Sequence, residues 1–358
     1  MRILLTGGCG FIGSAVVRHL IRDSGHSVVN VDKMTYAASE DALEEAGASD
    51  RHLLLRADIA DHAAMRDIFA THQPDAVMHL AAETHVDRSI DGPGPFIRSN
   101  VVGTYTLLDT AREYWTALPP VRKTAFRFHH ISTDEVFGAL GPNDPPFTEA
   151  TPYDPRSPYS ASKAASDHLV RAWHHTYDLP TLVSNTVNNY GPWQFPEKLI
   201  PLVTLNALQG RTLPVYGDGS NQRDWLYVDD HAAALRLVIE RGRPGATYAI
   251  GGRQPRTNLA VVHAICAALD MRVPDPAGPR ARLISFVTDR PGHDFRYEID
   301  PSLAEAALDW KAPHDFEAGL ARTVDWYLAN RPWWEAIRAG SYGGQRLGHA
   351  KMPITAGT

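Results

Sequence analysis

The sequence has few of the features that mark secreted, membrane-bound or nucleic-acid-binding proteins. It contains two cysteines, Cys9 and Cys266. We expect both to be free thiols in a reducing compartment, because Cys9 lies in a glycine-rich turn where a disulfide would obstruct a ligand. The net charge of −6 argues against a surface for nucleic acid. No apolar run approaches the roughly 20 residues of a membrane span, and the N-terminus reads as a strand rather than a leader. These observations predict a cytoplasmic protein without membrane or nucleic-acid partners.

A metal site is not predicted either. The histidine pairs at 129–130 and 174–175 have no cysteine or carboxylate at a recognisable ligand spacing, so we interpret them as packing and surface residues. The chain has 358 residues, 44% of them hydrophobic and 21% charged, which is ordinary globular composition. This length is enough for two domains that share an interface.

The first motif is a glycine-rich turn between a strand and a helix. An apolar run at 2–6 ends in Gly7, Gly10 and Gly13, and a helical pattern follows. Glycines let the backbone approach a pyrophosphate, and the N-terminus of a helix offers free N–H groups. A second strand ends in Asp32, where a carboxylate would bind both hydroxyls of an adenosine ribose. An acid there repels a 2′-phosphate, so the pattern favours NAD over NADP. The alternative is that Asp32 only caps a turn.

Strands and helices alternate along the first half of the chain. Strands are predicted at 28–32, 52–58, 75–82, 128–133 and 180–185, and helices at 62–72, 96–114 and 159–177. Near-continuous apolar strands alternating with helices predict an α/β fold with a doubly wound, parallel, Rossmann-type sheet. In such sheets ligands bind at the carboxyl ends of the strands, where the glycines, Asp32, Asp58 and residues 133–135 all fall.

The second half has shorter elements and more proline, which suits a smaller C-terminal substrate-binding domain. We predict a NAD-binding domain over residues 1–187, completed by strands near 224–254, and a substrate-binding domain over 188–330. Residues 331–358 are predicted to form a C-terminal tail. From Ser341 it is glycine-rich and without periodicity, so it is either disordered or an arm lying on a neighbour.

Proton-handling groups gather around the fifth strand and the helix after it. Thr133, Asp134 and Glu135 end the strand, and Tyr159 and Lys163 lie four residues apart on one helix face. The lysine ammonium is expected to lower the pKa of the phenol, so that Tyr159 can take a proton from a substrate hydroxyl while a hydride leaves the same carbon for NAD. Thr133 can share a hydrogen bond with that oxygen. The adjacent carboxyl groups could serve as base at an acidic C–H and as acid to a leaving hydroxyl, or form a solvated or capping pair.

These stretches resemble the dTDP-glucose 4,6-dehydratases, members of the extended short-chain dehydrogenase/reductases. The matching segments are TGGCGFIGS at 6–14, DKMTYA at 32–37, LAAETHVDRSI at 80–90, NVVGT at 100–104, HISTDEVFG at 130–138, YSASKA at 159–164, NNYGPWQFPEKLIP at 188–201, PVYGDGSNQRDWLYVDDH at 214–231 and DRPGHDFRYEID at 289–300. They run in order over nearly the whole chain, and the TDE triplet separates this family from related sugar epimerases. Cys9 and Thr84 depart from the residues usual in the family, but neither departure removes a required group.

The resemblance implies an NAD-dependent hydro-lyase that converts dTDP-D-glucose to dTDP-4-keto-6-deoxy-D-glucose and water, a step of deoxysugar biosynthesis such as the dTDP-rhamnose pathway. It implies that Tyr159, aided by Thr133, takes the 4-hydroxyl proton while C4 passes its hydride to NAD. Glu135 then removes the proton at C5 as Asp134 protonates the departing hydroxyl of C6. Return of the hydride to C6, with reprotonation of C5, gives the 4-keto-6-deoxy sugar and regenerates NAD.

The motifs and the resemblance together predict two sets of binding residues. The cofactor set is Gly7, Gly10, Phe11, Ile12, Gly13, Asp32, Lys33, Thr35, Asp58, Ile59, Leu80, Ala81, Ala82, Thr84, Ser99, Tyr159, Lys163 and Asn189. The resemblance implies the substrate set, which is Thr84, Thr133, Asn188, Lys198, Leu199, Pro214, Tyr216, Arg223, Asn258, Arg290 and His293. Arg223 and Lys198 suit a diphosphate, because a guanidinium fork matches two phosphate oxygens. For either of them, a surface salt bridge is the alternative.

Alternatives to this function stay open. The nucleotide could be UDP, GDP or CDP. The chain could also be a nucleotide-sugar 4-epimerase or oxidoreductase, although an epimerase has no leaving group for Asp134 or Glu135 to protonate. A non-enzymatic NAD-binding sensor is a third possibility, against which the intact Thr133, Tyr159 and Lys163 argue.

The helices near 96–114 and 159–176 carry more apolar surface than one face of a sheet explains. This excess predicts a homodimer built by helix packing.

Overall fold

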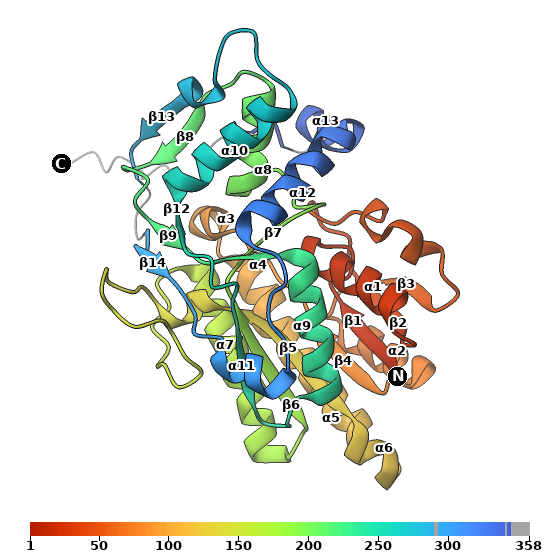
Figure 1. Cartoon of the computed structure of the whole chain (residues 1–358). Helices are drawn as coiled ribbons and strands as arrows, with labels where there is room; N and C mark the ends of the chain where they lie inside the picture. Colours follow the sequence, from red (N-terminus) through yellow and green to blue (C-terminus); the bar gives the residue numbers. More distant parts are fainter. Residues whose placement is uncertain (290–292, 341, 345–358) are drawn as a thin grey trace, which may run out of the picture.

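The centre of the protein is a seven-stranded sheet (Figure 1). The computed structural model describes residues 1–289, 293–340 and 342–344. The strand order is β11-β6-β5-β4-β1-β2-β3, and every neighbouring pair is parallel. The strands are β1 (Arg2–Thr6), β2 (Ser27–Asp32), β3 (His52–Arg56), β4 (Ala76–His79), β5 (Arg127–Thr133), β6 (Thr181–Thr186) and β11 (Thr247–Ile250). The predicted parallel, Rossmann-type sheet is confirmed.

Helices cover both faces of this sheet. They are α1 (Phe11–Asp23) and α9 (Val228–Arg241) on one face, and α2 (His62–His72), α5 (Gly103–Thr116) and α7 (Pro158–Tyr177) on the other. Side chains of a strand alternate between the faces, so Ile3 and Leu5 pack with α1 and α9 while Leu4 packs with α2 and α5. Because both faces are buried, the strands need apolar residues at nearly every position, which is the pattern seen in the sequence.

The helix predicted at 96–114 is built from three pieces. A short α4 (Gly94–Phe96) leads into a π-helical turn, η2 (Ile97–Val102), and α5 continues from Gly103. The wider turn buries Ser99 and Asn100. Such turns are rare and occur often at functional sites.

The start of α7 is fixed by a capping box. Ser157 accepts a hydrogen bond from the backbone N–H of Ser160 at 3.0 Å, and the Ser160 hydroxyl accepts one from the N–H of Ser157 at 2.9 Å. Pro158 occupies the first helical position, where its missing N–H costs nothing. Tyr159 is therefore held in the first turn of the helix.

The C-terminal part has its own smaller core, around Tyr190, Val215, Ile265 and Phe316. Three small sheets pair β7 with β10, β8 with β13, and β9 with both β12 and β14. The bounds are β7 (Asn188–Tyr190), α8 (Leu199–Leu208), β8 (Leu213–Tyr216), β9 (Gln222–Arg223), β10 (Trp225–Tyr227), β12 (Arg256–Thr257), α10 (Asn258–Arg272), η4 (Arg280–Leu283), β13 (Ile284–Val287), β14 (Arg296–Tyr297), α11 (Ser302–Leu308), α12 (Phe316–Ala329) and α13 (Arg331–Ala339). Most of these elements form the upper part of the view in Figure 1.

Four short helices lie in connections of the first half: η1 (Asp41–Ala48), α3 (Val86–Asp91), α6 (Pro120–Ala125) and η3 (Asp134–Phe137). Strand β11 comes from beyond residue 187 and completes the large sheet, while the predicted boundaries at 187 and 330 stay predictions. The predicted tail begins with helix α13, whose Trp334 is buried; apart from residues 342–344, the segment from Ser341 lies outside the described residues. Across the described part of the chain, none of the helices combines the length and apolarity needed to cross a bilayer.

Candidate active site

A cavity lies at the edge of the sheet where the parallel strands end. Its lining includes the residues at or just after the ends of β1, β2, β4, β5 and β6, namely Gly7, Asp32, Leu80, Thr133 and Thr186. Parallel strands bring their carboxyl ends to one edge, so residues far apart in the sequence meet there.

The glycine turn forms one wall of this cavity, and Gly7 and Gly13 leave no room for side chains at their positions. Gly7 has φ +76°, and a Cβ added there would lie 2.7 Å from the Cα of Ala81. A Cβ on Gly13 would lie 2.0 Å from the carbonyl oxygen of Gly7. Gly10 precedes α1, and no side-chain oxygen caps this helix. The free N–H groups of its first turn fit an anionic group such as a pyrophosphate.

Asp32 is held rigidly at the end of β2. Its carboxylate accepts hydrogen bonds from the backbone N–H groups of Cys9 at 2.9 Å and Met34 at 2.8 Å. Burial raises the pKa of Asp32, and these two hydrogen bonds oppose that rise. Its place beside the glycine turn fits the ribose-binding carboxylate of a dinucleotide site.

Nearly all the predicted cofactor residues line the cavity. They are Gly7, Gly10, Phe11, Ile12, Gly13, Asp32, Lys33, Thr35, Ile59, Leu80, Ala81, Ala82, Thr84, Ser99, Tyr159, Lys163 and Asn189. Asp58 is not among the lining residues: its carboxylate accepts from the N–H of Ala60 at 2.9 Å and lies 4.0 Å from Arg98. Its contact with a cofactor stays a prediction.

The five predicted catalytic residues line the same cavity. The Thr133 hydroxyl accepts from the backbone N–H of Glu135 at 3.2 Å, donates to Asp134 Oδ1 at 3.3 Å, and hydrogen-bonds the Tyr159 phenol. The strand end and the helix start thus bring together the hydroxyl, the phenol and both carboxyl groups. Lys163, one turn further along α7, donates to the carbonyl oxygen of Ile131 at 2.8 Å.

Asp134 is arranged as a neutral acid. It is 1% exposed, and its Oδ2 has no hydrogen-bond partner among the described residues. Burial, and next the charge of Glu135, hold the pKa of Asp134 well above its ordinary value. A carboxyl group that stays protonated at neutral pH can donate a proton to a leaving group.

The phenol of Tyr159 behaves differently from the expectation based on spacing. Burial, and next Glu135, raise the pKa of Tyr159 well above 10, and the hydrogen bond with Thr133 only partly opposes them. Lys163 directs its ammonium to Ile131, and burial lowers the pKa of Lys163 to about 8. The expected net lowering of the phenol's pKa is not found, because burial and the carboxyl groups of Glu135, Asp134 and Asp167 raise it despite the lysine.

The predicted substrate residues fall into two groups. Thr84, Thr133, Asn188 and Lys198 line the cavity, and Lys198 donates to the carbonyl oxygen of Thr84 at 2.8 Å. Leu199, Pro214, Tyr216, Arg223, Asn258 and His293 do not line it, and Arg290 lies outside the described residues. Arg223 is 5% exposed and donates to backbone carbonyl oxygens of β9 and of residues 294–295. Its role toward a diphosphate stays a prediction.

Two further residues escaped the sequence reasoning. Glu197 lines the cavity, accepts from the Tyr36 hydroxyl at 2.8 Å and pairs with Arg88 at 2.8 Å. Asn100, in the π-helical turn, bonds the backbone N–H and carbonyl of Glu83, another lining residue, at 2.8 and 3.0 Å. Both lie inside family-like segments, so the resemblance was the only signal that pointed to them.

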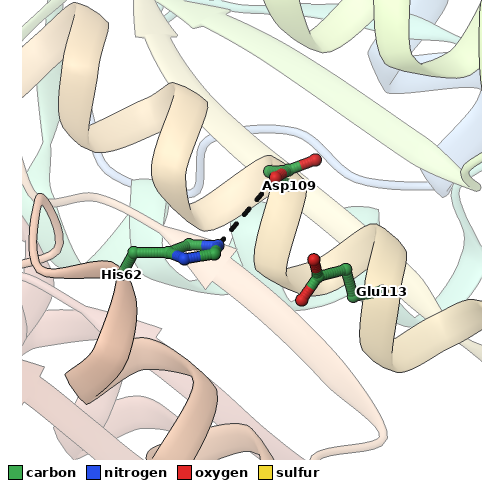
Figure 2. Close-up of side chains that lie close together, drawn as sticks. All are labelled: His62, Asp109 and Glu113. Carbon is green, nitrogen blue, oxygen red and sulfur yellow. Dashed lines mark ion pairs between the residues drawn. The ribbon is translucent and has the colours of Figure 1, made fainter.

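A separate cluster of His62, Asp109 and Glu113 brings three candidate metal ligands within 4.8 Å of one another. Figure 2 shows His62 of α2 facing Asp109 and Glu113 of α5, with 3.9 Å between His62 Nε2 and Asp109 Oδ2. Arg112 lies 2.9 Å from Asp109 and Arg66 lies 2.7 Å from Glu113. These guanidinium groups already neutralise the carboxylates and would repel a cation, so we interpret the cluster as surface ion pairs.

Comparisons with known proteins agree with this geometry. A family model described as GDP-mannose 4,6 dehydratase matches residues 4–323. A dTDP-glucose 4,6-dehydratase of Escherichia coli is 57% identical over 359 residues, covering 97% of this chain and 99% of that protein. The structure of a dTDP-glucose 4,6-dehydratase from Streptomyces venezuelae with NAD bound is 41% identical, with a TM-score of 0.86 over 94% of this chain and 100% of that chain. A UDP-glucose 4-epimerase from Thermus thermophilus in complex with NAD is 26% identical, with a TM-score of 0.80 over 92% and 100% of the two chains.

Proposed function

The chain belongs to the GDP-mannose 4,6 dehydratase family and, within it, to the dTDP-glucose 4,6-dehydratases, and from this we propose that it converts dTDP-glucose to dTDP-4-keto-6-deoxyglucose and water. The observation that carries the proposal is that Asp134 and Glu135 line the cavity that Thr133 and Tyr159 also line. An epimerase oxidises and reduces one carbon and loses no group, so it has no use for two further proton-transfer residues. Elimination of water requires both.

Several residues would hold the cofactor. The glycine turn and the first turn of α1 would bind the pyrophosphate, and Asp32 the ribose hydroxyls. Bound here, NAD would supply the hydride acceptor for C4 and donor for C6, and its oxidised ring would add positive charge to the cavity.

In the first step Tyr159 accepts the proton of the sugar 4-hydroxyl, and Thr133 hydrogen-bonds the same oxygen. The raised pKa of Tyr159 means that this transfer depends on compensating positive charge, of which Lys163 is the protein's contribution.

In the second step Glu135 removes the proton at C5, which the 4-keto group has made acidic. Asp134 donates its proton to the departing 6-hydroxyl, and its raised pKa keeps that proton available at neutral pH. Two carboxyl groups side by side thus take opposite roles, because one is buried and neutral.

We also propose that the protein acts as a homodimer. Ile97, Val102, Tyr105 and Tyr177 are 43–50% exposed, and they lie on η2, α5 and the end of α7. Large apolar side chains exposed along neighbouring helices suit burial against a second copy of the same surface. A cytoplasmic location is proposed with it, because Cys9 and Cys266 are both buried free thiols, in keeping with a reducing compartment.

The test is a parallel assay on dTDP-, UDP-, GDP- and CDP-glucose with the purified protein and added NAD. We expect dTDP-glucose to give a 4-keto-6-deoxy product, and the other nucleotides to react more slowly. Mass spectrometry separates the outcomes, because dehydration lowers the mass by one water and epimerisation leaves it unchanged. Epimerised product, or no product with any of the four, would contradict the proposal.

A further inference from the structure

Asp167 lies on α7, the helix that also carries Tyr159 and Lys163, and its carboxylate is fully buried against β5 and β6. It accepts hydrogen bonds at Oδ2 from three directions: from Ser132 of β5 at 2.9 Å, from Tyr153 at 2.7 Å and from Asn185 of β6 at 3.1 Å. Its Oδ1 lies 3.1 Å from Nε2 of His130. Asp167 is thus built into the structure as an anion, since a carboxylate with several donors favours its charged form.

The same group connects to Lys163. Lys163 lies one helical turn before Asp167, is 4% exposed, and has its Nζ 3.4 Å from His130 Nε2. One ring nitrogen of His130, Nε2, is therefore close to both the ammonium and the carboxylate. Asn185, besides bonding Asp167, donates to the carbonyl oxygen of Thr133 at 3.0 Å.

We propose that Asp167 is a positioning residue for the reaction, whose buried carboxylate acts with His130 to hold Lys163 in place as an ammonium. A buried cation needs a compensating anion, and Asp167 is a buried carboxylate that shares His130 Nε2 as a neighbour with Lys163. The proposal rests on the proposed function insofar as it concerns the dehydration, but the charge of Lys163 can be measured without any substrate.

The charges around the pair are consistent with this role. Burial lowers the pKa of Lys163 to about 8, and Asp167 opposes that shift. Burial would raise the pKa of Asp167, but His130 and Lys163 hold it below its ordinary value. Among the described residues, the titratable groups near the pair include His130 on β5, His79 of β4 packed against it, Tyr153, which bonds Asp167, and Arg171 of α7, which bonds Tyr153. Asp134 and Glu135 on η3 and Tyr159 on α7 line the cavity together with Lys163, and the charge of Asp167 also acts on Tyr159.

Asp167→Asn is the direct test, because asparagine keeps an acceptor at this position but removes the charge. The chain has six lysines, so Lys163 can be followed by NMR of lysine labelled with ¹⁵N at Nζ, its signal being the one absent from Lys163→Arg. In the native protein we expect it to titrate near pH 8. In Asp167→Asn we expect the titration to move down by about one pH unit or more.

Asp230→Asn is the matched control, because Asp230 is also a buried aspartate beside a histidine, 2.7 Å from His314. A purely structural role of buried aspartates would lower the stability of both variants and leave the Lys163 titration unchanged. The proposal predicts that Asp167→Asn shifts this titration and Asp230→Asn does not. Asp167→Glu should return it toward the native value.

The pH profile of dehydration supplies a second measurement. The alkaline limb of kcat should move to lower pH in Asp167→Asn, so that at pH 8 activity relative to its own maximum falls about fivefold, with an unchanged KM for dTDP-glucose.

An unmoved Lys163 titration in a folded Asp167→Asn overturns the proposal whatever the activity. If Asp167→Asn does not fold, the Lys163 titration in the native protein is the test. A Lys163 that is already neutral below pH 7 would overturn the proposal as well. An inactive native protein with the expected lysine titrations would count against the proposed function alone.

Discussion

The predicted site residues at the ends of the strands and those in the C-terminal part differ in how well the sequence located them. Thr133 ends β5, Asp134 and Glu135 follow it in η3, and all three line the cavity with the glycine turn. Tyr216 and Arg223, on the short strands β8 and β9, do not line it. The parallel ladder puts all strand ends on one edge, whereas short strands joined by loops take their position from packing. We therefore expect the strand-end residues to govern the chemistry, and the residues of the C-terminal part to govern the binding of the nucleotide.

The largest effect is expected at Tyr159. Tyr159→Phe removes the proton acceptor and keeps the ring, so oxidation at C4 should fall by about 10³-fold or more. The measurement is NADH absorbance in a single turnover with dTDP-glucose. Substantial NADH formation by a folded variant would show that Tyr159 is not the proton acceptor in the oxidation at C4.

Glu135→Gln should separate two steps that both depend on strand-end residues. NAD binding and oxidation at C4 should persist, whereas elimination should fall about 10²- to 10⁴-fold because the base at C5 is lost. NADH and 4-ketoglucose should accumulate together. Normal turnover of this variant would show that the base is assigned to the wrong residue.

Arg223→Lys tests the role of the C-terminal residues in binding the nucleotide. It keeps the charge but loses the guanidinium fork, so KM for dTDP-glucose should rise about tenfold while kcat changes less than about twofold. Arg256→Lys on the neighbouring β12 is the control, since Arg256 does not line the cavity and forms an ion pair with the exposed Glu317 at 3.2 Å. A loss of kcat as large as that of Glu135→Gln would show that Arg223 acts in the chemical steps and not mainly in binding.

The smallest effect is a gain in stability at Asp134. Its pKa is raised in the folded protein, so the unfolded chain ionises first and folding loses stability as pH rises above the ordinary value of the group. Asp134→Asn removes this loss, and Tm at pH 8 should rise by about 2 °C, an effect on the order of 1 kcal/mol. Thermal unfolding at pH 8 and pH 4 checks this, because the gain should shrink toward the acid end. A gain of equal size at both pH values would mean that ionisation is not its cause.

Much of the candidate site could be read from local signals. Gly7 and Gly13 lie in a turn where tight contacts exclude a side chain at either position, and Asp32 ends the second strand at the distance typical of a dinucleotide site. Glu197 and Asn100 could not be placed in this way. Their roles depend on partners 161 and 17 residues away, respectively, and on a π-helical turn that periodicity does not predict.

By itself the sequence determined the order of strands and helices, the parallel sheet, and the edge at which a nucleotide and proton-transfer groups meet. Those features follow from apolar periodicity and from polar residues at strand ends, which are local properties. Only the tertiary structure decided that Asp134 is a buried acid, that Lys163 is directed to Ile131, and that His130 and Asp167 lie beneath it. These depend on burial and on contacts between β5, β6 and α7, and the electrostatics of a buried group are set by neighbours that the order of residues does not reveal.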